Sequence, residues 1–197
     1  EIIKKYGIDE LRYYLMKEVS HGSDGNISLK SLENCINSDL ANNYGNLCQR
    51  IFSFVKNICN NKVINTKNIS AADRKLIEQT KTLTKDLRDL MNNQNLNNYI
   101  KSVINISFLT NKYINDEEPW KLKNNKEKMS NILHLSLEQI AKISILLNPI
   151  IPNASTKVLH ALNVKKRLKN FSLTNGKNII TDKIKIKKLD ILFKKIA

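Results

Sequence analysis

Apolar residues recur every three or four positions through residues 29–58, which is the spacing of one buried face of a helix. In the one wider interval, from Leu40 to Leu47, Asn43 or Tyr44 can complete the face. Ser28 is placed to cap the start, so the pattern predicts a long central helix that ends near residue 60. Its predicted buried residues are Leu29, Leu32, Ile36, Leu40, Leu47, Ile51, Phe54 and Ile58.

The same periodicity predicts further helices over residues 8–19, 71–91, 96–114, 126–147 and 152–162. A loop at 21–26 should end the first of these, Ser70-Ala-Ala-Asp73 fits a capping box, and Pro152 suits a first helical turn. Predicted inward-facing residues are Ile8, Leu11, Leu15 and Val19; Leu76, Thr80, Leu83, Leu87 and Leu90; Tyr99, Val103, Ile106 and Tyr113; and Met129, Leu133, Leu137, Ile140 and Ile143 or Ser144. Five Gly and three Pro in 197 residues argue against a turn-rich β fold. The sequence predicts an all-α protein, an antiparallel helix bundle with a C-terminal extended arm.

The arm is predicted from a change of pattern after Asn163. Residues 183–187 read Lys-Ile-Lys-Ile-Lys, and this period of two suits a short strand or an extended segment. The segment is so isolated that we expect it not to pair as a sheet. Leu189, Ile191, Leu192 and Phe193 are expected to form an apolar anchor that docks on the bundle.

Charge is concentrated in the last two-fifths of the chain. The net charge is +15. Residues 1–120 carry 16 basic and 14 acidic groups, a net +2, and residues 121–197 carry 17 and 4, a net +13. A polyanionic partner is favoured. Lys, Asn and Ile are all abundant, however, so a nucleotide bias in the genome is an alternative source of part of the lysine excess.

The sequence offers little for catalysis or metal binding. His21, His134 and His160 are scattered, and no nucleophile–base constellation or glycine-rich phosphate loop is present. The three cysteines lie within helical pattern without a Cys-x-x-Cys pair, which is typical of reduced thiols in a cytosolic protein and not of a zinc site. No apolar run reaches the roughly 20 residues of a membrane span. We therefore expect no catalytic residue, no metal site and no membrane association in this chain.

A polar stripe follows one edge of the central helix: Asn42, Asn46, Arg50, Ser53 and Asn57. Asn46 and Arg50 lie one turn apart, and an amide beside a guanidinium suits the reading of base edges. The competing interpretation is a solvated edge without function. Gly45 interrupts the helix at a cost of up to about 1 kcal/mol relative to Ala, unless a close approach requires it.

The segment Asn-Ser-Asp-Leu-Ala-Asn-x-x-Gly-Asn-Leu-x-x-Arg, residues 37–50, closely resembles the anticodon-binding domain of methionyl-tRNA synthetases. Four further segments support the resemblance in the same order and spacing: Tyr6 to Leu15, Glu118-Pro-Trp-Lys121, Leu147-Asn-Pro-Ile-Ile-Pro152, and Leu192 to Ile196. It covers essentially the whole chain. It implies a connector from a catalytic domain over residues 1–28, a helical anticodon-binding bundle over 29–162, and a basic arm over 163–197 that docks back on the body.

The resemblance also implies a function. The partner would be tRNA-Met, initiator and elongator, recognised through its CAU anticodon. Trp120 would stack on the first base, and Asn46 and Arg50 would hydrogen-bond base edges. Asn57, at the far end of the same polar stripe, is expected from its position to lie beyond the bases. Asp9 and Arg12 match a family signature that we interpret as structural, a local ion pair or cap.

The family's ATP-binding signatures, His-Ile-Gly-His and Lys-Met-Ser-Lys-Ser, do not occur here. The chain is therefore expected to be a fragment of a cytoplasmic methionine–tRNA ligase that uses ATP and Mg²⁺ in the catalytic domain of the same parent chain. The fragment itself should need no cofactor. Two alternatives stay open: the corresponding domain of a leucyl-, valyl- or cysteinyl-tRNA synthetase, or a non-enzymatic basic helical protein that binds RNA backbone without reading bases.

Overall fold

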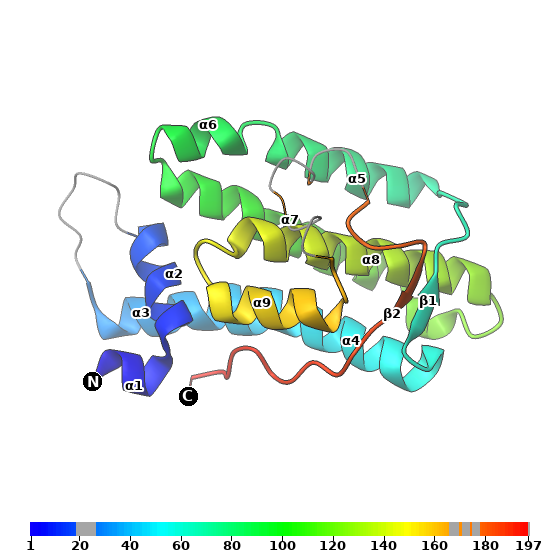
Figure 1. Ribbon diagram of the computed structural model, residues 1–197, viewed down its shortest axis with the longest axis horizontal. Helices are drawn as coiled ribbons and strands as arrows, with labels where there is room; N and C mark the ends of the chain where they lie inside the picture. The colour runs from blue at the N-terminus through cyan, green and yellow to red at the C-terminus, as the bar shows by residue number, and fades with distance from the viewer. Residues whose placement is uncertain (19–26, 166–169, 171–173, 175–177, 197) are drawn as a thin grey trace.

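The protein is an elongated bundle of helices with a short two-stranded ribbon on its side (Figure 1). The computed structural model describes residues 1–18, 27–165, 170, 174 and 178–196, so the expected loop at 21–26 and Val19 lie outside it. The helices are α1 Ile2–Tyr6, α2 Ile8–Glu18, α3 Leu29–Cys35, η1 Ile36–Gly45, α4 Asn46–Cys59, α5 Ala71–Thr84, α6 Leu87–Asn92, α7 Leu96–Glu117, η2 Pro119–Lys121, α8 Lys126–Leu147 and α9 Pro152–Ala161. The strands are β1 Lys62–Ile64 and β2 Lys183–Lys185. The predicted all-α class is confirmed.

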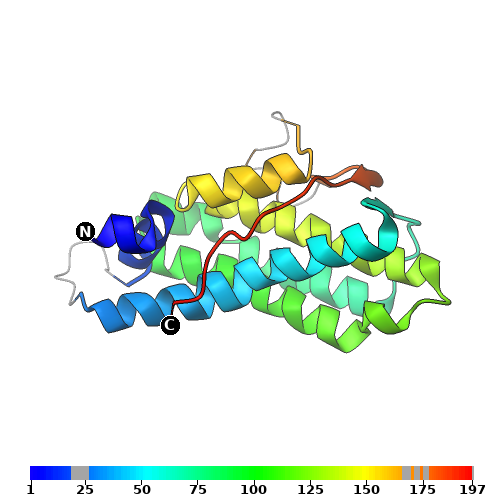
Figure 2. The ribbon, with the colours of Figure 1, turned by 90° about the horizontal axis from the view of Figure 1, so that it is seen from below.

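The central helix is continuous from α3 through η1 to α4, as predicted (Figure 2). Ser28 caps it by accepting a hydrogen bond from the Ser31 amide at 3.1 Å. Its middle, η1, is a π-helix, in which hydrogen bonds reach one residue further back than in an α-helix. This widened turn carries Asn43 and Tyr44 inward together, which accounts for the wide interval in the apolar pattern.

The ends of that helix, the Ser28 cap and a last turn near residue 60, are confirmed, but the burial predicted for its first and last apolar residues is wrong. Leu29 and Ile58 are about half exposed, because the bundle does not extend far enough to cover the first and last turns. Residues off the predicted stripe, Cys48, Phe52 and Val55, are buried in their place. Widening at η1 changes the angular position of the residues after it, so the buried face of α4 includes these residues beside the predicted Leu47 and Ile51.

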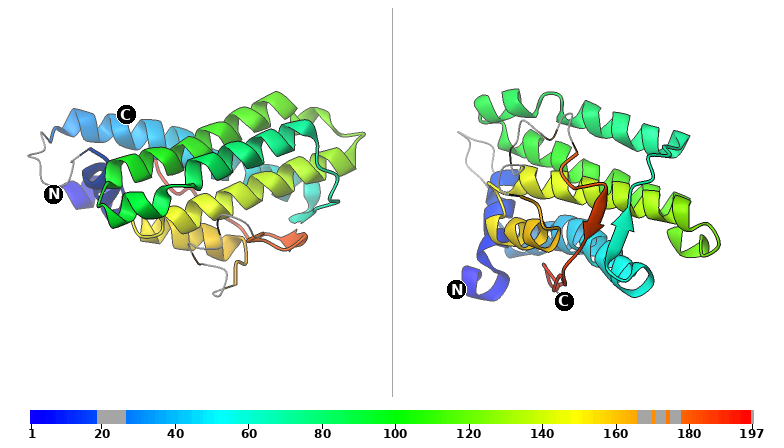
Figure 3. Two further views of the ribbon diagram at one scale, coloured as in Figure 1. Left: turned by 90° about the horizontal axis from the view of Figure 1, so that it is seen from above. Right: turned by 45° about the vertical axis from the view of Figure 1, so that its right-hand side comes forward.

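Helices α7 and α8 form the centre of the bundle, with α5 and α6 packed on α7 and α9 on α8 (Figure 3). The bounds predicted for α8 are confirmed, and this helix is buried on nearly all sides. Several buried polar groups in the core are hydrogen-bonded: the Tyr99 hydroxyl donates to the Leu146 carbonyl at 2.7 Å, and the hydroxyls of Tyr44 and Ser144 lie 2.8 Å apart. Among the described residues, the buried atoms Gln139 Nε2 of α8 and Ser155 Oγ of α9 have no such partner. The core is therefore largely apolar with several hydrogen-bonded exceptions.

The helix predicted over residues 71–91 is interrupted. The capping box of Ser70 and Asp73 is confirmed, with both reciprocal hydrogen bonds present. The break follows Thr84, whose hydroxyl donates to the carbonyls of Thr80 and Lys81. Such back-bonding competes with regular helix propagation, and the chain restarts as α6.

The first helices use a different face from the predicted one. Tyr13 and Tyr14 of α2 are fully buried, whereas Ile8 is exposed and Leu11 and Leu15 are half-buried. Tyrosine can be buried here because its hydroxyl finds a partner: that of Tyr13 donates to the Asp39 carboxylate at 2.8 Å. The buried face of α2 is therefore set by its two tyrosines and not by the aliphatic residues on which the prediction was based.

Asp9 and Arg12 are structural, as expected, but they form no local pair. The Asp9 carboxylate accepts from the Ala154 amide at 2.8 Å and so caps the start of α9. Arg12 donates to the carbonyls of Pro149 and Ile150 at 2.7 and 2.9 Å. Both side chains thus fasten α2 to the turn between α8 and α9.

The expectation that residues 183–187 would not pair as a sheet was wrong. Strand β2 pairs antiparallel with β1, with Lys62 opposite Lys185 and Val63 opposite Ile184. The partner strand follows directly on α4, after Asn60 and Asn61, which adopt positive φ and reverse the chain. A strand of three residues carries almost no local signal, and its partner lies at the far end of the sequence.

Beyond β2 the chain runs back along the central helix (Figure 2). Leu189 and Phe193 are buried as expected, with the Phe193 ring 6.5 Å from that of Tyr44. Ile191 is 64% exposed, so it is not part of the anchor. The Asn37 side chain exchanges two hydrogen bonds with the Ile196 backbone, at 2.8 and 2.9 Å, and fixes the end of the arm.

Cys35, Cys48 and Cys59 are free thiols. No group of three or more His, Cys, Asp or Glu side chains in the described residues could hold a metal ion. Within the same residues, no helix has the length and apolar character required to cross a bilayer.

Candidate RNA-binding site

A groove of about 380 Å³ opens between the last turns of α4, the end of α7 and η2. Its wall is largely apolar, with Arg50, Ser53 and Asn57 as the polar exceptions. The lining residues are Arg50, Ile51, Ser53, Phe54, Asn57, Ile58, Ile114, Pro119 and Trp120. The structure thus places Arg50 and Trp120, which are 70 positions apart in the sequence, in the wall of one groove.

Trp120 is presented by a tight turn at the end of α7. Glu118 adopts a left-handed conformation with φ 43°, which ends the helix, and Pro119 begins the short 3-10 helix η2. Pro119 is buried, while Trp120 is 40% exposed. An ion pair of 2.8 Å between Lys121 and Glu118 closes the turn. The indole therefore stands on a fixed backbone with part of its surface open to solvent.

Arg50 lies next to the indole. Its Cζ atom is 5.9 Å from the centroid of the Trp120 ring, within the range of a cation–π contact. Its Nη2 donates to Asn115 Oδ1 at 2.7 Å, and its Nη1 to Asn111 Oδ1 at 3.5 Å. Both partners are neutral amides. The guanidinium is oriented without being neutralised, which leaves its positive charge available to a ligand.

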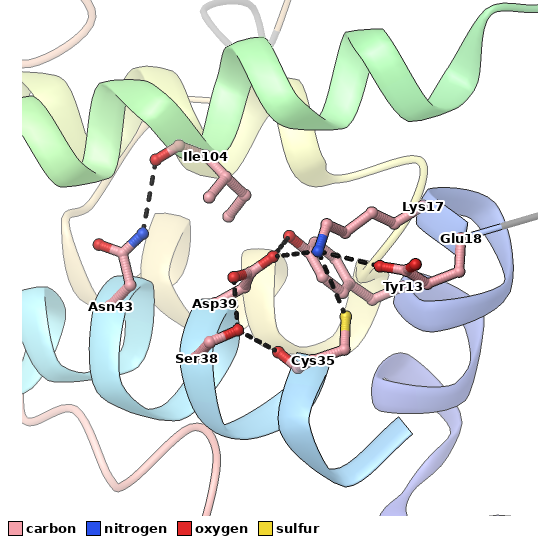
Figure 4. A network of polar contacts seen from close by, with 8 residues as sticks. All are labelled: Tyr13, Lys17, Glu18, Cys35, Ser38, Asp39, Asn43 and Ile104. Carbon is pink, nitrogen blue, oxygen red and sulfur yellow. Dashed lines mark hydrogen bonds and ion pairs between the residues drawn. The ribbon is translucent and has the colours of Figure 1, made fainter. Parts of the chain in front are cut away.

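A buried amide stands behind these contacts. Asn43 is only 2% exposed, and its Oδ1 accepts from Ser107 Oγ at 2.9 Å and from Asn111 Nδ2 at 3.0 Å. Its Nδ2 donates to the Ile104 carbonyl at 3.5 Å (Figure 4). The chain of hydrogen bonds therefore runs from the π-helix through Asn111 to Arg50.

Sequence reasoning missed Ser107, Asn111 and Asn115 as part of this site. A signal was available, because the three lie four residues apart along α7. Residues four positions apart form one line along the surface of a helix. Three polar side chains on such a line indicate that this side of α7 faces other polar groups.

Asn46 and Asn57 lie differently from what was expected. Asn46 is exposed one turn before Arg50, but it does not line the groove. Asn57, which we expected beyond the bases, is in the groove wall together with Trp120. The reason is that η2, which packs on α8, faces the C-terminal half of α4 across the groove, so the groove extends from Arg50 toward the end of that helix.

A second polar cluster lies toward the opposite end of the bundle (Figure 4). Asp39 accepts from Tyr13 at 2.8 Å and from Ser38 at 2.7 Å, and it pairs with Lys17 at 3.0 Å. Cys35 Sγ is 3.8 Å from Lys17 Nζ. Burial raises the pKa of the Cys35 thiol to about 12, which keeps it protonated and unreactive at neutral pH. The cluster fastens α2 to η1 and offers no nucleophile.

Two families match this sequence. Residues 63–197 match the family described as the anticodon-binding domain of methionyl tRNA ligase, and residues 1–52 match class I tRNA synthetases (M). The junction between the matches therefore lies within and just after α4.

Curated relatives and solved structures agree with these matches. Methionine–tRNA ligases from Brucella suis, Rickettsia conorii and Thermotoga maritima are 33%, 35% and 32% identical over 87%, 91% and 99% of this chain. The same alignments cover 34%, 38% and 32% of those proteins, so the chain spans about a third of their length. The apo structure of Mycobacterium tuberculosis methionyl-tRNA synthetase superposes with a TM-score of 0.91 at 25% identity, over all of this chain and 40% of that one. A structure of that protein bound by methionyl-adenylate gives 0.90 at 25% identity, over 98% and 39%.

Proposed function

Because the chain belongs to the family of anticodon-binding domains of methionyl-tRNA ligases, we propose that it is the part of a methionine–tRNA ligase that binds tRNA-Met through the CAU anticodon. The match is to the methionyl family, so the alternatives among leucyl-, valyl- and cysteinyl-tRNA synthetases are set aside. The observation that carries the proposal is the groove in which the exposed indole of Trp120 lies beside the un-neutralised Arg50.

Trp120 is the proposed stacking platform. Anticodon bases are single-stranded and can be splayed out, and a base that stacks on an aromatic ring gains about 1–3 kcal/mol. The indole is 40% exposed and its backbone is fixed by Pro119 and the Lys121–Glu118 pair. A base can therefore stack there without first ordering a loop.

Arg50 and Asn46 are the proposed readers of base edges. Asn115 and Asn111 hold one side of the guanidinium, and its remaining N–H groups are free to donate to base acceptors. Asn46, exposed one turn away, adds an amide that can both donate and accept. Asn57 and Ser53, which line the groove, are proposed to contact the same bases or their sugars.

The parent enzyme is proposed to attach methionine to initiator and elongator tRNA-Met in the cytoplasm, using ATP and Mg²⁺. Those reactions are proposed to take place in a catalytic domain of the parent enzyme; of the present chain, only residues 1–52 match the family described as class I tRNA synthetases (M). The residues described here bind and position tRNA. We expect the isolated chain, free of host synthetase, to show no methionine-dependent ATP–pyrophosphate exchange above a buffer control.

The test compares two anticodon stem-loops, one with CAU and one with a single changed base, by fluorescence anisotropy. Trp120→Ala should cost about 1–3 kcal/mol of binding to the CAU stem-loop. Arg50→Lys keeps the charge but loses the planar fork, so it should reduce discrimination more than it reduces affinity for the changed stem-loop. Asn46→Ala should cost about 1–3 kcal/mol of discrimination.

Asn98→Ala is the matched control, because this exposed amide lies at the other end of α7 from the groove. Asn57→Ala is unsuitable as a control, because Asn57 lines the groove. All variants are first shown to be folded by circular dichroism. If the ratio of the two affinities survives all three substitutions, the base-reading role is wrong, and equal affinity of the wild-type chain for both stem-loops would favour a basic protein that binds RNA backbone only.

A further inference from the structure

The outer face of the β1–β2 ribbon carries lysines that have no acidic partner. Lys62 of β1 and Lys183 and Lys185 of β2 are exposed, while Val63 and Ile184 between them are buried against the bundle. No ion pair with a carboxylate forms at any of these three lysines in the described part of the chain, and the nearby Asp182 pairs instead with Lys67 at 3.4 Å. The ribbon therefore presents uncompensated positive charge.

The strand register makes this arrangement unfavourable in the free protein. Lys62 lies directly opposite Lys185, and like charges at directly opposed positions destabilise an antiparallel pair. A two-stranded ribbon has little stability of its own to offset this repulsion. A bound anion between the two side chains would remove the repulsion, which is the physical reason to look for one.

The lysines are also held at a regular spacing. Side chains two residues apart along a strand project to the same side at about 6.6–6.8 Å. Backbone hydrogen bonds to other segments fix β2 and the residues that follow it: the Ile186 amide donates to the Asn61 carbonyl at 2.9 Å, and the Lys187 amide to the Ala161 carbonyl at 2.8 Å. A row of cations on a rigid extended backbone suits an anion that repeats along a line.

The ribbon lies beside the C-terminal end of α4 (Figure 1), the part of that helix which lines the groove. Strand β1 begins four residues after Ile58, which lines the groove. It is anchored to the first turns of α8, where Ser130 Oγ donates to the Ile64 carbonyl at 2.7 Å and accepts from the Ile64 amide at 3.0 Å. An RNA whose loop enters the groove would therefore bring its adjoining stem near this face.

We propose that Lys62, Lys183 and Lys185 form a second contact surface for tRNA, which binds phosphates of the RNA backbone without reading sequence. The proposal rests on the proposed function for the choice of RNA. Phosphate contacts position a nucleic acid while base contacts specify it. The ribbon thus supplies affinity, and the groove supplies discrimination.

The main test is Lys185→Glu, assayed with tRNA carrying the CAU anticodon. A glutamate opposite Lys62 replaces a repulsion by an attraction, so the melting temperature should rise. The same change removes one phosphate contact, which should weaken tRNA binding at least about fivefold at 0.1 M salt. A fall in affinity together with a rise in thermal stability separates a binding role from a structural one. Unchanged tRNA affinity would overturn the proposal.

A second variant replaces Lys62, Lys183 and Lys185 by Gln and is read from the salt dependence of binding. Three lost contacts should flatten the slope of log affinity against log salt by roughly 2 to 3. The control replaces three exposed lysines on the α5 and α7 side, Lys75, Lys85 and Lys101. An equal change of slope in both triple variants would show that binding depends only on the total charge of the chain, and it would refute a specific contact surface on the ribbon.

The outcomes also separate the two proposals. If the ribbon variants keep the wild-type preference for CAU over a changed anticodon and lose affinity equally for both, both proposals stand. If the wild-type chain shows no preference but the ribbon variants still flatten the slope, anticodon recognition fails and the ribbon surface stands. If an acidic protein or an anionic vesicle binds at the ribbon lysines and tRNA does not, the ribbon proposal fails.

Discussion

Gly45 offers a sharp test of the π-helix, because two effects of a Gly45→Ala change oppose each other. Helix propensity alone predicts a gain, since Gly in a helix interior costs about 1 kcal/mol relative to Ala. The backbone at Gly45 is ordinary right-handed helix, with φ −63° and ψ −44°, so its conformation does not require glycine. Any loss must therefore come from the space around it.

That space is closed on two sides. A Cβ atom at Gly45 would lie 2.7 Å from the Leu40 carbonyl oxygen and 3.4 Å from Phe193 Cδ2. The first of these contacts is with backbone, which cannot rotate away. Overpacking of this kind costs about 1–3 kcal/mol. After the propensity gain of about 1 kcal/mol is subtracted, the variant should be less stable by up to about 2 kcal/mol.

The assay is thermal and urea unfolding of Gly45→Ala beside Asn42→Ala, an exposed position in the same π-helix. The control should be neutral or slightly stabilised, because it gains propensity without a clash. For a chain of this size, each 1 kcal/mol shifts the melting temperature by about 2–4 °C. If Gly45→Ala matches or exceeds the control in stability, the close approach of Leu40 and the arm at this residue is refuted.

Two substitutions and one labelling experiment test other parts of the structure. Phe193→Ala should cost about 3 kcal/mol in urea unfolding, since it empties a buried site under the arm, and a neutral result would show that the arm is not docked there. Asp9→Ala should cost about 1 kcal/mol by the same assay, because the Ala154 amide at the start of α9 loses its acceptor; no change would show that the cap is not formed. With iodoacetamide at pH 8, followed by mass spectrometry, the half-buried Cys59 should react first. Cys48, fully buried with its pKa raised by burial, should react only on unfolding, and early labelling of Cys48 would contradict the packing of α4.

The helices could be predicted from the sequence because each is long enough to repeat its apolar period several times. The bounds of α8, the Ser28 cap and the Ser70–Asp73 capping box all follow from local rules. The ribbon could not be predicted, because each strand has three residues and its partner is far away in the sequence. The burial of Tyr13 depends on Asp39, which only the folded chain brings near.

The candidate site divides in the same way. Arg50 and Trp120 could be named from the sequence, through the spacing on the helix and the resemblance of the surrounding segments. That Arg50 Cζ lies 5.9 Å from the Trp120 ring, and that Asn57 shares their groove, depends on how the bundle places η2 opposite α4. Asn43 could not be recognised as part of the site, because its role depends on Ser107 and Asn111 from another helix.

The length of helix α7 fixes the distance between the N-terminal helices and the groove. It begins beside α2, which matches the synthetase family of residues 1–52, and it ends at the turn that presents Trp120. Its 22 residues span about 33 Å at 1.5 Å per residue. The helices packed along it hold this length rigid, so the distance from the connector to the groove is set by a residue count. Adding or removing one helical turn near the start of α7 would change that reach by about 5.4 Å, while Ile114 in the groove wall and the turn that presents Trp120 would keep their sequence.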